Sequence, residues 1–244
     1  PEISLSELSA DIVKGLVSKV TVDGETVVAE YVEVGKTAQT KKEAGTALSQ
    51  TLLNFGLPKD KLDKVIKNAE KNKVISIISN GLNYEDNLKV LEISKKHPIV
   101  KASLGIYPLD GIKLNERDLE KTFEHIKLNK NKIIAIGEVG MDLKYDSNLK
   151  KQKEIFLRVI KLSEKIKKPL IIHSRGAERE VIEILETSKS KRFLFHSFTG
   201  NFKLVKKIFD NGYFISIPCN IVRAKHFQDI VKKFNFNQML TETD

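Results

Sequence analysis

Hydrophobic and polar positions follow a repeating order along residues 57–244. Short apolar runs rich in β-branched residues predict strands, and the amphipathic stretches between them predict helices. The predicted strands are residues 74–79, 100–107, 133–139, 169–173, 193–196, 213–217 and 239–243. The predicted helices are residues 60–71, 84–96, 116–128, 149–167, 177–188, 203–211 and 224–234.

This alternation predicts an α/β fold with a parallel sheet covered by helices, because a connection between parallel strands must be long enough to hold a helix. The number of units favours a TIM-type (β/α)8 barrel in which the first strand is not recognised. An open doubly wound sheet is the alternative. No glycine-rich phosphate loop follows any of the predicted strands, which weighs against a nucleotide-binding sheet.

Residues 1–52 have a different pattern. Apolar spacing predicts a short helix within residues 3–17, and Asp23-Gly24 predicts a hairpin between residues 20–22 and 26–34. A second helix is expected from about Lys41 to Leu53. We therefore predict two parts, a helix, hairpin and helix segment of residues 1–52 without an assigned role, and a barrel of residues 53–244.

Composition narrows the class of protein. The chain of 244 residues is 41% hydrophobic and has one Cys, which excludes a disulfide framework and a Cys-rich zinc module. It contains no apolar run long enough to span a membrane and no secretory signal, so a soluble cytoplasmic protein is expected, with no membrane partner. The pattern predicts no oligomeric state.

Charge is unevenly distributed along the chain. Residues 1–52 hold five Lys and eight Asp or Glu, whereas residues 53–244 hold 37 basic and 24 acidic side chains. The lysines can be a solvated coat on polar helix faces, or a field that attracts phosphates. Both interpretations stay open at the level of sequence.

Titratable side chains occur where the predicted strands end. Glu138, His173, His196 and Asp244 each end a different strand, and a barrel brings such residues together at the carboxyl side of its sheet. Imidazole and carboxylate ligands suit Zn²⁺ or Mn²⁺, while Mg²⁺ favours more oxygen. Each residue alone also has a structural interpretation: a buried His, a helix-capping Glu, or a solvated pair of Glu242 and Asp244.

Four segments in this order, GEVGMD, PLIIHSR, FHSFTG and TETD, resemble the TatD family of metal-dependent hydrolases. The resemblance implies a (β/α)8 barrel, one or two divalent metal ions (Zn, Mn or Mg), and hydrolysis of phosphodiester bonds in DNA. It also implies that Glu138 bridges the metals, that His173 and His196 are ligands, and that Asp244 is a ligand that orients the attacking water. Arg175 would bind a phosphate oxygen, or form a surface salt bridge.

The sequence departs from the family pattern in three places. The family begins with a strand bearing His-x-His, but no His precedes His97 here; Tyr107 stands where many relatives have His; and the family continues beyond Asp244 with a closing helix. The first strand and closing helix are therefore expected to be missing or replaced, or the site is a divergent one, and loss of His-x-His would impair activity.

Three hypotheses about function follow. The first is a DNA phosphodiesterase of the TatD type. The second is an amide or ester hydrolase on the same fold, such as an aminoacyl-tRNA deacylase. The third is a non-catalytic basic module that binds nucleic acid, with a vestigial site.

Overall fold

The computed structural model describes residues 2–4, 7–8, 11–12, 14, 16–23, 26–41 and 59–243. They form two compact units, Pro1–Ile75 and Ser76–Asp244. The boundary expected between residues 52 and 53 lies outside the described residues and stays a prediction.

The first unit contains a three-stranded antiparallel sheet of β1 (Val17–Asp23), β2 (Thr26–Tyr31) and β3 (Thr37–Lys41). The unit also contains helix α3 (Lys59–Lys71). Buried and half-buried residues alternate along β2, so every second side chain faces the core. The core of the unit consists of Leu8, Val27, Ala29, Tyr31 and Ala38.

Expectations for this unit are met in part. The hairpin is confirmed by the pairing of Asp23 with Thr26. The helix predicted within residues 3–17 is supported by helical residues 7–8 and 11–12, but it does not extend to Val17, which begins β1; the predicted strand of residues 26–34 ends at Tyr31. The helix expected from Lys41 is wrong at that residue, which belongs to β3, and residues 42–53 lie outside the described residues. The Thr-rich β3 carries too few apolar residues to be recognised from its pattern.

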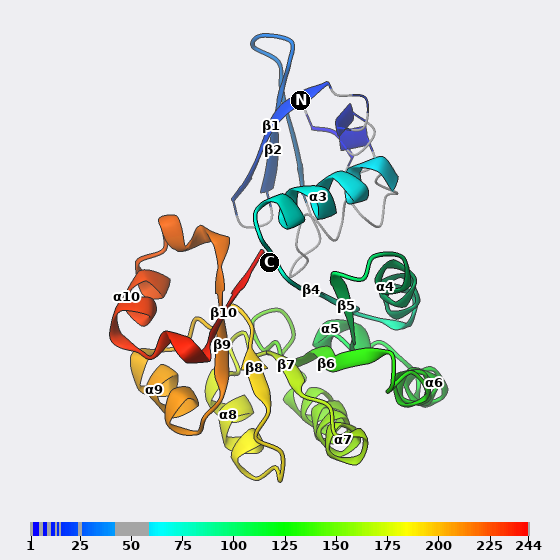
Figure 1. The fold of residues 1–244 in the computed structure, drawn as a ribbon, viewed down its shortest axis with the longest axis vertical. Coiled ribbons are helices and arrows are strands. Elements are labelled where there is room, and N and C mark those ends of the chain that lie inside the picture. The colour runs from blue at the N-terminus through cyan, green and yellow to red at the C-terminus, as the bar shows by residue number, and fades with distance from the viewer. Residues whose placement is uncertain are drawn as a thin grey trace. The chain divides into compact units, whose positions relative to one another are not determined.

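The second unit is a curled sheet of seven parallel strands (Figure 1). The strands are β4 (Ile77–Asn80), β5 (Val100–Leu104), β6 (Ile133–Gly140), β7 (Leu170–His173), β8 (Phe193–Phe195), β9 (Phe214–Pro218) and β10 (Met239–Glu242). They are neighbours in their order along the chain. That order confirms the barrel architecture over a doubly wound sheet, in which the strand order would reverse. Within the described residues of this unit, the sheet contains no eighth strand.

Helices surround the outer side of this sheet (Figure 1). They are α4 (Tyr84–Lys96), α5 (Pro108–Gly111), α6 (Glu116–Leu128), α7 (Leu149–Ile166), α8 (Glu178–Glu186), α9 (Phe202–Asp210) and α10 (Lys225–Lys233). Two 3₁₀ turns, Cys219–Val222 and Phe236–Gln238, flank α10. Apart from α5 and these turns, the pattern of the sequence predicts each helix to within about two residues at either end.

Asparagine caps begin four of these helices. The side chains of Asn83, Asn115, Asn148 and Asn201 each accept a hydrogen bond from a backbone N–H in the first turn of α4, α6, α7 and α9. Such a cap contributes about 1 kcal/mol by satisfying a donor that the helix leaves unpaired. The caps fix where the helices start after the carboxyl ends of the strands.

The core of the second unit lies between the strands and the helices. All four residues of β7 are buried, as expected for a strand covered on both faces. Leu104, Ile136, Ile172 and Phe195 on successive strands are almost completely buried. Each buried aliphatic or aromatic side chain contributes about 1.5–3 kcal/mol. No helix in the described part of the chain has the length and apolarity that crossing a membrane requires.

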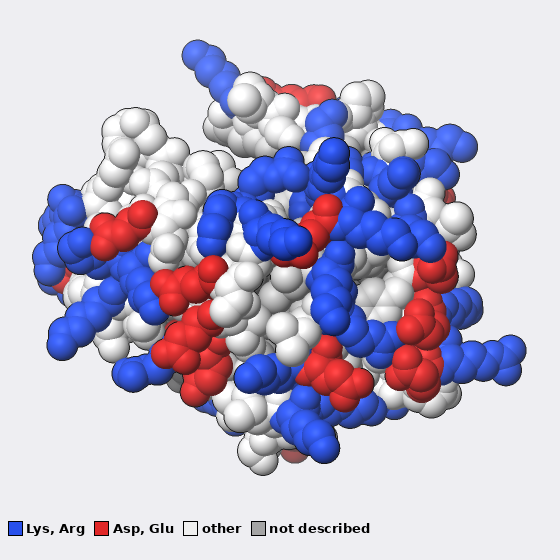
Figure 2. Space-filling view, turned by 90° about the horizontal axis from the view of Figure 1, so that it is seen from below, with Lys and Arg blue, Asp and Glu red and all other residues white. Residues whose placement is uncertain are grey.

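On the face seen in Figure 2, lysine and arginine side chains are widely spread and interspersed with acidic ones. Several lysines pair with a carboxylate one turn away on the same helix, for example Lys127 with Glu124 at 2.8 Å and Lys206 with Asp210 at 2.6 Å. Exposed pairs of this kind contribute only about 0.3–0.5 kcal/mol. Much of the positive charge therefore forms solvated helix faces.

Candidate metal centre

The carboxyl ends of β6, β7 and β8 bring three of the predicted ligand residues together. Glu138 lies near the end of β6, His173 ends β7, and His196 follows β8 directly. Nδ1 of His173 is 2.8 Å from Oε1 of Glu138, and Nε2 of His196 is 3.4 Å from the same oxygen. These ligand atoms all lie within 4.8 Å of one another. The predicted convergence of the three side chains is confirmed.

Two glycines make room for this arrangement. A Cβ atom on Gly105, after β5, would lie 2.3 Å from the backbone nitrogen of Glu138. Gly140 has a φ of +139°, and a Cβ there would lie 1.9 Å from the carbonyl oxygen of His173. The two glycines therefore allow β5, β6 and β7 to approach closely where the acid and the imidazole stand.

The outer nitrogen of each imidazole is bonded to a further carboxylate. Nε2 of His173 lies 2.9 Å from Oδ2 of Asp142, and Nδ1 of His196 lies 3.0 Å from Oε2 of Glu242. The Ser216 hydroxyl donates to the same Glu242 oxygen at 2.6 Å. Imidazoles that bind metals commonly donate their second N–H to such a carboxylate.

Sequence reasoning assigned no role to Asp142, Glu242 or Tyr107. Asp142 belongs to the GEVGMD segment that was singled out, and Glu242 stands two residues before Asp244. Alternation along a strand puts residues two apart on the same face, which was the available signal for Glu242. Tyr107 was singled out only as a departure from the family pattern, and its contact was not foreseen: its hydroxyl donates to Asp142 at 3.3 Å.

Charge coupling within the site shifts several pKa values. Burial raises the pKa of Glu138, but the charge of His196 and the hydrogen bonds with both imidazoles outweigh burial, so this pKa lies well below its usual value. Burial lowers the pKa of His173, but its hydrogen bonds with Asp142 and Glu138 raise the pKa overall. The site thus holds negative charge beside two imidazoles, which suits a cation.

The donor set fits a divalent metal ion. Glu138, His173 and His196 would hold such an ion with one carboxylate oxygen and two imidazole nitrogens, the number of protein ligands found in catalytic zinc sites. Oε1 of Glu242 is buried and has no hydrogen-bond partner among the described residues, so this part of the centre has unused acceptor capacity. Asp244 lies outside the described residues, and its part in the site stays a prediction.

The other histidines lie on helices or at their ends, as expected. His97 follows α4, His125 lies on α6, and His226 lies on α10. Nε2 of His226 lies 3.1 Å from the carbonyl oxygen of Phe198. Among the described residues, none of these three histidines belongs to the cluster of Glu138, His173 and His196.

A small hollow of about 50 Å³ opens at the two imidazoles. It is lined by His173, Ser174, Arg175, Glu178, His196, Ser197 and Thr199. The Arg175 guanidinium lies 5.4 Å from the ring centre of Tyr145 in the loop after β6. The structure therefore places Arg175 at the rim of the predicted site, and its contact with substrate stays a prediction.

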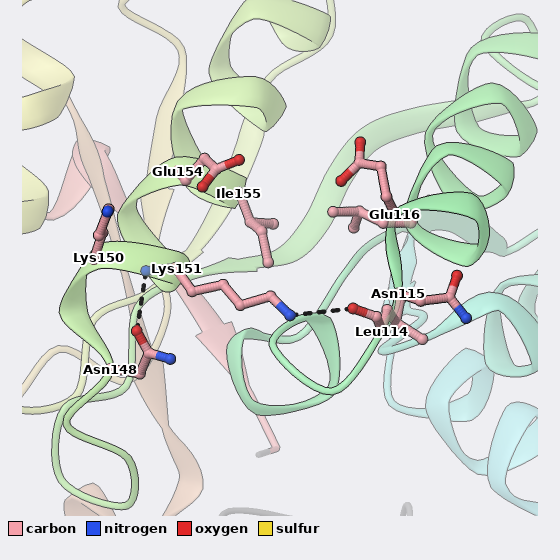
Figure 3. A pocket seen from close by; sticks show the side chains of 9 residues that line it. Leu114, Asn115, Glu116, Asn148, Lys150, Lys151, Glu154 and Ile155 are labelled. Atoms are coloured by element: carbon pink, nitrogen blue, oxygen red, sulfur yellow. Dashed lines mark hydrogen bonds between the residues drawn. The ribbon is translucent and has the colours of Figure 1, made fainter.

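A larger hollow of about 310 Å³ lies between the starts of α6 and α7 (Figure 3). Its polar lining mixes lysines with Glu116 and Glu154. The Lys151 ammonium donates to the carbonyl oxygens of Ile112 and Leu114, at 2.6 and 3.2 Å. Lys151 is therefore bonded to backbone, and none of the residues that line this hollow belongs to the cluster of Glu138, His173 and His196.

Parallel strands of a barrel that end in a carboxylate and two imidazoles define the class of metal-dependent hydrolases built on this fold. A family model described as TatD related DNase matches residues 50–244. The chain belongs to the TatD family of metal-dependent hydrolases, as its sequence motifs indicated.

Individual relatives agree with this assignment. An uncharacterized metal-dependent hydrolase of Methanocaldococcus jannaschii is 36% identical over 182 residues, which cover 75% of this chain and 71% of the relative. The human protein named deoxyribonuclease TATDN3 is 28% identical over 195 residues, which cover 75% of this chain and 71% of the relative. The crystal structure of the TatD homologue YJJV from Escherichia coli K12 has the same fold, with a TM-score of 0.70 at 24% identity, covering 78% of this chain and 76% of YJJV.

Proposed function

We propose that this chain hydrolyses phosphodiester bonds in DNA and holds a divalent metal ion with Glu138, His173, His196 and Asp244. The observation that carries the proposal is the convergence of three ligand atoms within 4.8 Å at the carboxyl edge of the sheet. The human relative named a deoxyribonuclease supports DNA as the substrate class.

The ligand chemistry supports one ion rather than two. Two imidazole nitrogens and carboxylate oxygen favour Zn²⁺ or Mn²⁺ over Mg²⁺. A second ion would need further ligands, and this sequence offers no His before His97. We therefore expect about one tightly bound ion per chain.

Each residue has a defined task in this proposal. A divalent ion held at the centre supplies Lewis acidity, which activates water and polarises a phosphate oxygen. Arg175 pairs its planar guanidinium with phosphate oxygens, and the hydroxyl groups of Ser197 and Thr199 line the same hollow. Asp244 accepts a proton from the attacking water, a role that rests on its place in the TETD segment.

The test combines metal content with cleavage. The purified chain is analysed for bound metal and incubated with DNA and added Mg²⁺, Mn²⁺ or Zn²⁺. His173→Ala and His196→Ala should each lose bound metal and cleavage, because each removes one of the converging nitrogens. His97→Ala is the matched control, since His97 lies at the end of α4, and it should retain both.

Three outcomes would overturn the proposal. A chain that neither binds metal nor cleaves DNA has no such activity. Release of amino acids from aminoacyl-tRNA without DNA cleavage would show that the chain hydrolyses amides or esters instead of DNA. Salt-sensitive DNA binding without turnover, unchanged by the two histidine substitutions, would indicate a non-catalytic basic module.

A further inference from the structure

Asp142 is held from several sides in the interior of the second unit. Its side chain is fully buried, directly after β6. Its backbone N–H donates to Oε1 of Gln152 at 2.7 Å, and its carbonyl oxygen accepts from Nε2 of the same residue at 2.9 Å. This pair of hydrogen bonds to Gln152 on α7 fixes the backbone from which the Asp142 carboxylate extends.

The two oxygens of this carboxylate serve different parts of the molecule. Oδ1 accepts the backbone N–H groups of Lys144 and Tyr145, at 3.0 and 3.2 Å. Oδ2 lies 2.9 Å from Nε2 of His173 and accepts the Tyr107 hydroxyl at 3.3 Å. A buried carboxylate with this set of donors is ionised and can only accept, so Nε2 of His173 must be the donor.

The other ring nitrogen of His173 faces the metal centre. Nδ1 lies 2.8 Å from Oε1 of Glu138. When a neutral imidazole carries its proton on Nε2, Nδ1 presents a lone pair. Without a metal ion, a second ring proton on Nδ1 satisfies this contact, in line with the raised pKa of His173, and a bound cation would take the place of that proton. The Tyr107 ring packs edge-on against the imidazole with ring centres 5.1 Å apart, which restricts rotation of the His173 ring.

We propose that Asp142 is a positioning residue that fixes His173 in the tautomer protonated at Nε2, so that Nδ1 is free to bind the metal ion. The same carboxylate anchors the loop that carries Lys144 and Tyr145 next to Arg175. The inference rests on the ligand set of the proposed function and does not depend on the substrate.

Asp142→Asn tests the inference with a side chain of nearly the same shape. The amide offers one acceptor and one donor group. The two loop N–H groups require the acceptor on their side, so the NH₂ group faces Nε2 of His173. The imidazole proton then moves to Nδ1, the position that should bind metal. We expect the affinity for Zn²⁺ to fall about 10–100-fold.

Two readouts test this without measuring activity. ¹⁵N spectra of histidine-labelled, metal-free protein, recorded where the imidazole is neutral, should show protonation at Nε2 of His173 in the wild type and at Nδ1 in Asp142→Asn. Chelator competition gives the Zn²⁺ affinity. Tyr107→Phe removes one donor to Oδ2 and should keep the wild-type tautomer. Asp86→Asn, at a buried aspartate on α4, controls for the loss of a buried charge elsewhere.

The results separate this inference from the proposed function. If His173→Ala retains metal, the ligand set is wrong. If His173→Ala loses metal while Asp142→Asn keeps wild-type affinity and tautomer, the positioning role of Asp142 is wrong. If Asp142→Asn does not fold, the wild-type spectrum decides, because a proton on Nδ1 of neutral His173 would by itself overturn the inference.

Discussion

The carboxyl edge of the parallel sheet and the small antiparallel sheet differ in what they bury. At β6–β8, carboxylates and imidazoles are enclosed together, with Asp142 fully buried and His173 nearly so. In the first unit, the inward residues of β2 are Val27, Ala29 and Tyr31. Burying ionisable groups is costly unless they are paired, whereas burying apolar groups is favourable in itself.

The two regions differ in whether stability alone explains their residues. The antiparallel sheet can be explained by its stability alone. The cluster at the parallel sheet is a costly way to stabilise a fold, because well-packed apolar residues often match buried ion pairs in stability. Metal binding by this cluster would explain why its ionisable side chains are buried despite the energetic cost. Substitutions in the parallel sheet should therefore change metal binding, whereas those in the antiparallel sheet should change stability alone.

The largest expected effect is on metal binding by Glu138→Gln. This change removes the charge that faces both imidazoles and keeps the shape of the side chain. We expect affinity for Zn²⁺ to fall by more than about 100-fold, since a ligand is lost rather than one of its supports. Equilibrium dialysis with metal analysis measures the change.

A substitution outside the centre serves as the control for Glu138→Gln. Val27→Ala in the first unit should leave metal affinity within error of the wild type. If both variants lost the same metal affinity, metal binding would depend on the general stability of the fold and not on the cluster. The proposed contrast between the two regions would then be wrong.

A smaller effect is expected on local stability from the same Val27→Ala substitution. Val27 is fully buried in a core of few residues, so the loss of two methyl groups should cost about 2 kcal/mol. Hydrogen exchange in β1–β3 should become roughly 10–30-fold faster, while protection in β5–β8 stays unchanged. Val32→Ala, at an exposed position after β2, should change neither. Faster exchange throughout both sheets would show that the units unfold together.

Much of the fold could be predicted from the sequence because strand and helix periods alternate clearly. Each strand of the parallel sheet was predicted, and so was the convergence of Glu138, His173 and His196, from their places at strand ends. Short elements were missed because α5 and the 3₁₀ turns are too short for a period to show. The strand β3 was missed because Thr and Gln dominate it.

The supporting residues of the centre could not be predicted because their roles depend on contacts between distant segments. Tyr107 and Asp142 are 35 residues apart, and Glu242 is 46 residues from His196. Strand alternation was a signal for the face on which Glu242 lies, but no local spacing shows which distant side chain it contacts, and an Asp or Glu at a strand end has several ordinary roles. These supporting residues can be identified only from the folded sheet, in which the ends of neighbouring strands lie side by side.

A still smaller effect is expected from a short hydrogen bond beside the apolar core of the first unit. The Tyr31 hydroxyl donates to Oδ2 of Asp11 at 2.6 Å, and this hydrogen bond, together with burial and nearby negative charge, raises the pKa of Tyr31 to about 12 from 10.0. Because the folded pKa is above the unfolded one, the folded unit binds this proton more tightly. Its contribution to stability is complete below about pH 10 and is lost as the pH rises through about 12.

The Tyr31 contribution can be isolated by substitution. In Tyr31→Phe, the fall in stability of β1–β3 between about pH 10 and 12 should become shallower, and the difference in tyrosinate absorbance from the wild type should show one group titrating near pH 12. Asp11→Asn should bring that titration closer to 10, because it removes the charge that disfavours the phenolate. If the missing group titrates near 10 in the wild type, the hydrogen bond is not formed in solution, and the first unit would then be stabilised by its apolar core alone.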